Sequence, residues 1–408
     1  MAATRERVLV TVIFALDGFL FGNWVVCVPQ VKAHVHASAG SLGLALLGIS
    51  AGAVLTMVIT GRLCARFGSA PITAASATLM SLAILLPARV TSVAALAVVL
   101  FVFGAGFGGL NVALNSSAVA ITGHVGRPIM PSFHAAFSLG GLLGALVGGA
   151  LAAVLSAVWH LTVTGLFGLA VTALVGTLLI RAEASVAAPT PRPPERATAR
   201  PPERATARPA GARQARLPTL AGRPRVFVAV FGLIALCSAY GEGAMADWGA
   251  LHLHENLHTS VGLAAAGYAS FSGAMVVGRL SGTWLLHRFG RTFVLAAGGL
   301  TAAAGMLVAA LVPVLALAIA GFILIGLGLA NIFPAAIGQA GALDGPKGVA
   351  TASTIGYFGL LAGPPTIGFL AERTGLPAAL TTVSLLAAIG ALVAVLVHRA
   401  EAAPATAR

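Results

Sequence analysis

The chain has 408 residues, of which 58% are hydrophobic and 9% are charged, and its mean hydropathy is +0.97. Soluble domains carry about 25% charged residues, so this composition excludes an ordinary soluble protein and indicates a membrane protein. The formal net charge of +13 does not indicate nucleic-acid binding, because ten of the 24 basic residues lie in one central stretch and no basic globular domain is left.

Twelve apolar runs are long enough for transmembrane helices, each of which needs about 20 residues. Six of them precede the centre of the chain, at 8–28, 42–63, 70–87, 93–121, 133–157 and 160–180. Six follow it, at 226–250, 261–286, 291–312, 314–338, 348–371 and 376–398. The sequence therefore predicts an all-α integral membrane protein with twelve transmembrane helices in two six-helix bundles.

The stretch 181–225 separates the two sets of apolar runs. It contains ten arginines, three glutamates and a tandem repeat of PPERATAR that begins at Pro193 and again at Pro201. Because it has no aromatic residues and few large aliphatic ones, it cannot form a core. We expect an N-terminal bundle at 1–180, a disordered linker at 181–225, a C-terminal bundle at 226–400 and a tail at 401–408.

Basic residues indicate the orientation in the membrane. With the N-terminus inside, the inner loops and tails hold 20 Lys and Arg residues, whereas the outer loops hold three. Positively charged loops stay cytoplasmic, so both termini and the linker are predicted to be cytoplasmic.

The two halves repeat each other. Asn23-Trp24 corresponds to Asp247-Trp248, and four further matches follow in the same order at offsets of 219 to 222 residues. These are the segments that begin at Ser41 and Ser260, Arg66 and Arg288, Gly106 and Gly326, and Gly140 and Gly359. Five collinear matches predict a parallel repeat of six helices.

These residues resemble the major facilitator superfamily over essentially the whole chain. The segment GRLCARFG at 61–68 is similar to the family's inner-gate loop, although Ala65 replaces the usual aspartate. The segment HAAFSLGG at 134–141, with Glu242-Gly and Asp247-Trp248, resembles a bacterial branch distantly related to fucose permease. The gating candidates that the resemblance supplies, together with one basic residue inside the eighth span, are Gly61, Arg66, Gly68, Arg279 and Arg288.

The resemblance implies a secondary transporter of the bacterial plasma membrane that works by alternating access. Its partners would be a small-molecule substrate, protons and the lipid bilayer, without cofactor, nucleic acid or enzymatic activity, and we expect a monomer. The family's central cavity is lined by helices 1, 4, 7 and 10.

Polar residues inside the spans lie on those same four helices. Polar groups in hydrocarbon are costly, so those that are retained are functional candidates. They are Asp17, Asn23, Asn111, Asn115, Glu242, Asp247 and Asn331.

The roles of these residues are separable by depth. Asp17 and Glu242 are the proton-coupling candidates, because burial favours the protonated form of an acid until water enters; a permanently neutral structural acid is the alternative. Asp247-Trp248 is placed near the outer interface, where a membrane anchor competes with a cavity role. The asparagines would bind substrate or tie helices together.

Trp24, His134, Tyr240 and Tyr357 complete the predicted substrate cavity, with simple packing as the alternative for His134 and Tyr357. Arg279 either extends to the inner membrane surface or pairs with a cavity carboxylate.

One motif points to a different class of protein. The sequence HENLH at 254–258 fits the zinc-protease pattern, and Asp344-Gly345 would supply a third ligand. The predicted topology places these two segments on opposite sides of a bilayer core of about 30 Å, so no metal site is expected.

The absence of a GxxxxGK[ST] motif leaves ATP-driven transport unsupported. The sequence thus favours a proton-coupled transporter, with sugar-like uptake or lipophilic-cation efflux as the open alternatives. An intramembrane zinc protease and a non-transporting membrane sensor are the more remote ones.

Overall fold

The structure is a computed structural model that describes residues 2–125, 130–187 and 224–402. All regular elements in these ranges are helices. The tandem repeat in the linker lies outside the described residues.

The apolar runs of the N-terminal half are helical, because in lipid they can satisfy their backbone hydrogen bonds only as helices. Its elements are α1 (Ala2–His34), α2 (Ala39–Phe67), α3 (Ser69–Ala83), α4 (Val93–Val125), α5 (Met130–Val154), α6 (Ala157–Val171), the π-helical segment η1 (Thr172–Gly176) and α7 (Thr177–Ala187). The last three elements are one continuous span, and α7 extends beyond residue 181, where the linker was predicted to begin.

The C-terminal half repeats this arrangement. Its elements are α8 (Pro224–Ala244), the π-helical segment η2 (Met245–Gly249), α9 (Ala250–Asn256), α10 (Val261–Phe289), α11 (Arg291–Leu311), α12 (Leu315–Leu329), α13 (Ile332–Thr374) and α14 (Leu376–Ala402). Here α8, η2 and α9 form one span, which is the counterpart of α1.

Two of the predicted spans differ from the structure in length or continuity. Eleven of the helices in the described part of the chain are long and apolar enough to cross a membrane, whereas α3 has only 15 residues and ends in a turn. The predicted loop near 339–347 is helical and belongs to α13. Nevertheless, Gly348 lies against the carbonyl of Ala340, which a straight helix would place about 12 Å away, so the chain turns sharply there.

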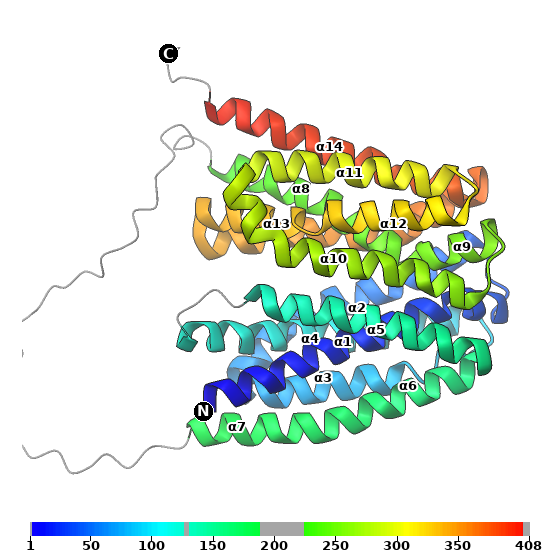
Figure 1. The fold of residues 1–408 in the computed structure, drawn as a ribbon. Coiled ribbons are helices and arrows are strands. Elements are labelled where there is room, and N and C mark those ends of the chain that lie inside the picture. Colours follow the sequence, from blue (N-terminus) through cyan, green and yellow to red (C-terminus); the bar gives the residue numbers. More distant parts are fainter. Residues whose placement is uncertain (1, 126–129, 188–223, 403–408) are drawn as a thin grey trace, which may run out of the picture.

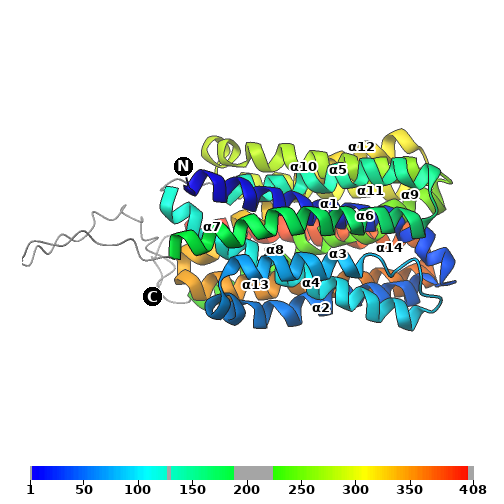
Figure 2. The ribbon, with the colours of Figure 1, turned by 90° about the horizontal axis from the view of Figure 1, so that it is seen from below.

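The helices run along one common direction in both views (Figures 1 and 2). We call the side where α7 ends and α8 begins the linker side, and the opposite side, where α1 leads into α2, the far side. The start of α1 and the end of α14 also lie on the linker side (Figure 1).

The halves meet along two repeat-related pairs of helices, α2 with α13 and α5 with α10. Within each half, matched glycines permit close packing: Gly140 of α5 lies against the carbonyl of Ala15, and Gly359 of α13 lies against that of Leu236. Such small residues let membrane helices approach closely. The glycine repeat in the sequence therefore marks the same helix contact in both halves.

Candidate functional site

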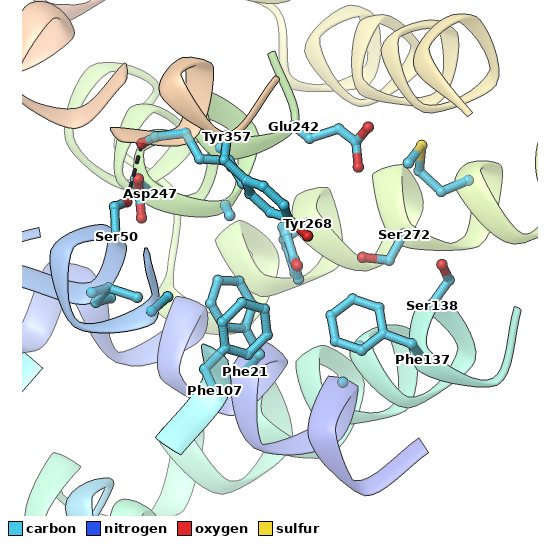
Figure 3. Close-up of a pocket in the computed structure, with 18 of the residues that line it drawn as sticks. Phe21, Ser50, Phe107, Phe137, Ser138, Glu242, Asp247, Tyr268, Ser272 and Tyr357 are labelled. Atoms are coloured by element: carbon cyan, nitrogen blue, oxygen red, sulfur yellow. Dashed lines mark hydrogen bonds between the residues drawn. The ribbon is translucent and has the colours of Figure 1, made fainter. Parts of the chain in front are cut away.

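A cavity of ≈ 190 Å³ lies between the two halves. The N-terminal half contributes side chains from α1, α2, α4 and α5, and the C-terminal half contributes side chains from α8, η2, α10 and α13 (Figure 3). Its lining is mostly apolar, and its charged members are Glu242, Asp247 and Arg279.

One end of the cavity holds an ion pair. Arg279 Nη2 lies 3.1 Å from Glu242 Oε2, and Ser238 Oγ donates to Glu242 Oε1 at 3.3 Å. Arg279 Nη1 also donates to Ser138 Oγ at 2.7 Å. Because Ser138 belongs to α5 and the other groups belong to the C-terminal half, Arg279 connects the two halves inside the cavity.

The other end of the cavity holds Asp247, which lies near Ser50 and the ring of Tyr268 (Figure 3). The side chain of Asp247 makes no hydrogen bond or ion pair with any residue that the structure describes. It lies on η2, and π-helical turns insert an extra residue into a helix and occur frequently at functional sites. The next residue, Trp248, is fully buried, so the alternative of an interfacial anchor is wrong for this tryptophan.

Aromatic rings separate the two ends. In the N-terminal half, Phe107 has ring-centroid distances of 5.2 Å to Phe21 and 6.3 Å to Phe137. On the opposite wall, the rings of Tyr268 and Phe271 are 6.0 Å apart. Tyr357 of α13, one of the predicted cavity residues, lines the same space (Figure 3).

Asn23 and Trp24 lie outside this cavity. Asn23 is fully buried, donates to the carbonyl of Phe19 at 2.9 Å and contacts His160 Nε2 at 2.8 Å. His160 Nδ1 also lies 3.1 Å from Cys27 Sγ. This polar cluster joins α1 to α6, and the buried ring of Trp24 packs beside Phe103.

The other predicted cavity asparagines also contact neighbouring helical groups. Asn115 Nδ2 donates to the carbonyl of Asn111 at 2.8 Å, one helical turn away. Asn331 lies at the break between α12 and α13 and donates to the carbonyl of Gly278 on α10 at 2.7 Å. None of these amides lines the cavity: Asn331 connects the α12–α13 break to α10, whereas Asn111 and Asn115 contact each other within α4.

Three more candidates lie outside the cavity lining. The ring of His134 packs 5.7 Å from that of Phe14, and Tyr240 Oη lies 2.9 Å from Thr382 Oγ1. Asp17 is 1% exposed, and its Oδ1 has no hydrogen-bond partner among the described residues.

The gating candidates divide into two groups. Arg279 lies in the cavity and pairs with the carboxylate of Glu242, which is the second of the two alternatives given for this residue. Gly68, with φ +89°, ends α2 beside Arg66, and Gly290, with φ +79°, ends α10 beside Arg288. Positive φ is readily adopted by glycine, which explains why both repeats end their helices with this residue. At Gly61, no atom of a neighbouring residue lies within 4 Å of the position that a Cβ atom would take.

A carboxylate that the sequence did not suggest lies at this turn. Glu183 of α7 accepts hydrogen bonds from the backbone N–H groups of Ser69 and Ala70 at 3.0 and 2.9 Å. It therefore caps the start of α3, next to the position where Ala65 replaces the family's aspartate.

Two polar contacts join the halves at the far side. Lys32 Nζ of α1 lies 2.6 Å from Glu255 Oε1 of α9, and Glu372 of α13 accepts hydrogen bonds from Ser38 Oγ and from the N–H of Gly40 at 3.0 Å. We call these contacts the far-side latch. They hold the end of α1 and the start of α2 against the C-terminal half.

The HENLH segment and the preceding His252 contact other protein groups. Glu255 belongs to the latch, and His254 Nδ1 lies 2.7 Å from the carbonyl of Thr259. His252 Nε2 lies 3.0 Å from the carbonyl of Ala309. In the described part of the chain, no three His, Cys, Asp or Glu side chains are grouped as metal ligands would be.

Two repeated bundles of membrane-spanning helices that enclose a charged cavity between them form the architecture of a secondary transporter. A family model described as Major Facilitator Superfamily matches residues 8–355, and the chain belongs to this family. An uncharacterized transporter of Sinorhizobium fredii is 34% identical over 93% of this chain and 95% of that protein.

Solved structures show the same fold. A bacterial homologue of the human lysosomal transporter Spinster, in an inward-facing conformation, aligns with a TM-score of 0.72 and 16% identity over 98% of this chain and 97% of that one. The transporter FucP in its outward conformation aligns with a TM-score of 0.61 and 17% identity over 95% of this chain and 97% of that one. The predicted family and the twelve-helix fold are therefore confirmed.

Proposed function

We propose that this transporter moves a small solute across a bacterial plasma membrane by alternating access, with proton coupling, and that the central cavity is its substrate site. The observation that carries the proposal is the position of Arg279, which pairs with Glu242 in one half and donates to Ser138 in the other. If Arg279 exchanges its hydrogen-bond partners, the contact between the two halves changes with it.

Glu242 is the proposed proton carrier. Protonation would remove the charge that holds Arg279 and would weaken their ion pair, so that Arg279 is free to respond to the halves as they rock. Asp17 is proposed as a second proton site, because it is buried in α1 with one oxygen unpartnered.

The membrane orientation and domain boundaries complete the proposal. The charge distribution supports a cytoplasmic linker side, with bundles at 1–180 and 226–400, a cytoplasmic linker at 181–225 and a tail at 401–408. The far-side latch would then close the outer entrance. A monomer provides the complete cavity, because both of its walls come from one chain.

The test is transport by the purified protein in proteoliposomes under an imposed pH gradient, with panels of sugars and of lipophilic cations. We expect Glu242→Gln to abolish pH-driven accumulation and Asp17→Asn to reduce it, whereas Asp344→Asn, at an exposed linker-side acid, serves as the matched control. Full pH-driven transport by both Glu242→Gln and Asp17→Asn would contradict proton coupling through these acids. Ligand binding without any transport would instead favour the sensor alternative.

A further inference from the structure

One acidic side chain of the cavity has no basic partner. Glu242 and Arg279 neutralise each other at one end, so the lining retains one carboxylate, Asp247, at the other end. The guanidinium already donates to Glu242 and Ser138, and the carboxylate of Glu242 compensates its charge. The unpartnered Asp247 therefore makes the free end of the cavity attractive to a cation.

The aromatic lining of the cavity also suits a cation. Phe21, Phe107 and Tyr268 line the same cavity as Asp247 (Figure 3). The faces of such rings attract ammonium groups, and quaternary ammonium ligands are bound in aromatic cages of this composition.

The cavity offers few free hydrogen-bonding groups to a polyol such as a sugar. Of the cavity's three serines, Ser50 donates to the carbonyl of Leu360 at 3.1 Å, Ser138 accepts from Arg279, and Ser272 is hydrogen-bonded to Tyr268. The amides of Asn111, Asn115 and Asn331 do not line the cavity. Sugar hydroxyl groups buried against the aromatic walls would lose hydrogen bonds to water without replacement, which is unfavourable.

The volume limits the size of the ligand. The cavity of ≈ 190 Å³ is slightly larger than the engineered cavity of about 150 Å³ that accommodates benzene. A body of about one ring with a small charged head group fits this space.

We propose that the cavity binds a small monovalent organic cation, with its ammonium group beside Asp247 and its single-ring apolar body against Phe21, Phe107 and Tyr268. This proposal rests on the cavity being the transport site. It assigns Asp247 the role of substrate recognition and leaves Glu242 and Arg279 for coupling.

The test measures binding to the full-length protein in lipid nanodiscs by calorimetry. The probe is benzyltrimethylammonium, which stays charged at every pH, and the comparison ligands are its uncharged isostere neopentylbenzene and the anion phenylacetate. We expect the cation to bind at least about tenfold more tightly than either, a difference of about 1.4 kcal/mol.

Variants locate the interaction. Asp247→Asn is expected to weaken binding of the cation at least about tenfold without changing that of neopentylbenzene, and Asp247→Glu is expected to recover part of the loss. Tyr268→Leu should weaken binding several-fold, since a cation–ring contact is lost. Asp344→Asn is the matched control, and thermal unfolding of each variant verifies that it is folded.

The proposal is overturned if the neutral isostere or the anion binds as tightly as the cation, if Asp247→Asn binds the cation normally, or if the wild-type protein binds no cation. Failure of the transporter proposal is distinguishable from this outcome. Labelling of a cavity cysteine from the two sides of the membrane needs no ligand, and it reports alternating access whatever the substrate is.

Discussion

Arg279 and Glu242 form an ion pair at 3.1 Å in which neither partner is fully withdrawn from solvent, with side-chain exposures of 18% and 25%. Removing one partner of such a pair leaves the other charge uncompensated in an apolar cavity. The pair thus has a direct consequence for stability as well as for transport.

We expect the single variants Glu242→Gln and Arg279→Gln each to lower the free energy of unfolding by about 1–3 kcal/mol, less than for a fully buried pair because of the remaining exposure. The double variant should be more stable than the sum of the two losses predicts, since it leaves no lone charge. Thermal unfolding in detergent of all four proteins measures this coupling. Additive losses would show that the two side chains do not interact.

The far-side latch predicts a conformational effect. Exposed ion pairs contribute about 0–1 kcal/mol, so Lys32→Glu, which replaces attraction to Glu255 by repulsion, should raise the fraction of molecules open at the far side by about fivefold or more. The exchange of both charges, Lys32→Glu with Glu255→Lys, should restore closure.

The measurement is labelling of Ser50→Cys, in the cavity, by a membrane-impermeant maleimide added from the far side, in a background in which the partly exposed Cys64 is replaced by serine. Equal labelling rates in the wild-type, single and exchanged proteins would show that this pair does not control the far-side entrance.

The matched glycines predict a packing effect. A Cβ atom at Gly359 would collide with the backbone carbonyl of Leu236, and one at Gly140 would collide with that of Ala15. Backbone atoms cannot move aside as a flexible side chain does, so Gly359→Val and Gly140→Val should each destabilise the protein by several kcal/mol.

Fluorescence-detected size-exclusion chromatography after heating provides the measurement. The control is Gly338→Ala, because nothing lies within 4 Å of the added Cβ atom at that glycine. Unchanged melting of the two valine variants would contradict close contact of these helices.

We expect transport to tolerate changes in the order of the linker residues. Scrambling residues 193–208 at constant composition should leave transport nearly unchanged, because a charged, proline-rich tether is defined by its length and extension and not by its order. Transport and surface expression are compared with those of the original chain. A large loss of activity at normal expression would show that a partner recognises the repeat.

The locations of the polar residues show where prediction from the sequence succeeded and where it stopped. Glu242, Asp247, Arg279 and Tyr357 do line the cavity. Asn23 and Asn331 instead contact other helices, and Asn111 and Asn115 contact each other within α4. The aromatic walls formed by Phe21, Phe107, Phe137, Tyr268 and Phe271 gave no signal, because phenylalanine faces lipid and protein interior alike.

The sequence by itself determined the helical class, the positions of the spans and the repeat. Hydrocarbon excludes unsatisfied backbone groups, so every crossing must be a long apolar helix that is visible in one dimension. The family followed from loop and span residues that recur in order.

The tertiary structure alone decided which face of each helix is turned to the cavity. In a soluble helix the polar face reveals the orientation, but these helices are apolar towards lipid and towards each other, so their hydrophobic pattern carries little information on rotation. Asp247 is therefore a cavity residue and Asn23 a packing residue, although they occupy matching positions of the two repeats. Asn23 is buried against His160 where α1 packs on α6, whereas Asp247 lies on η2 and lines the cavity.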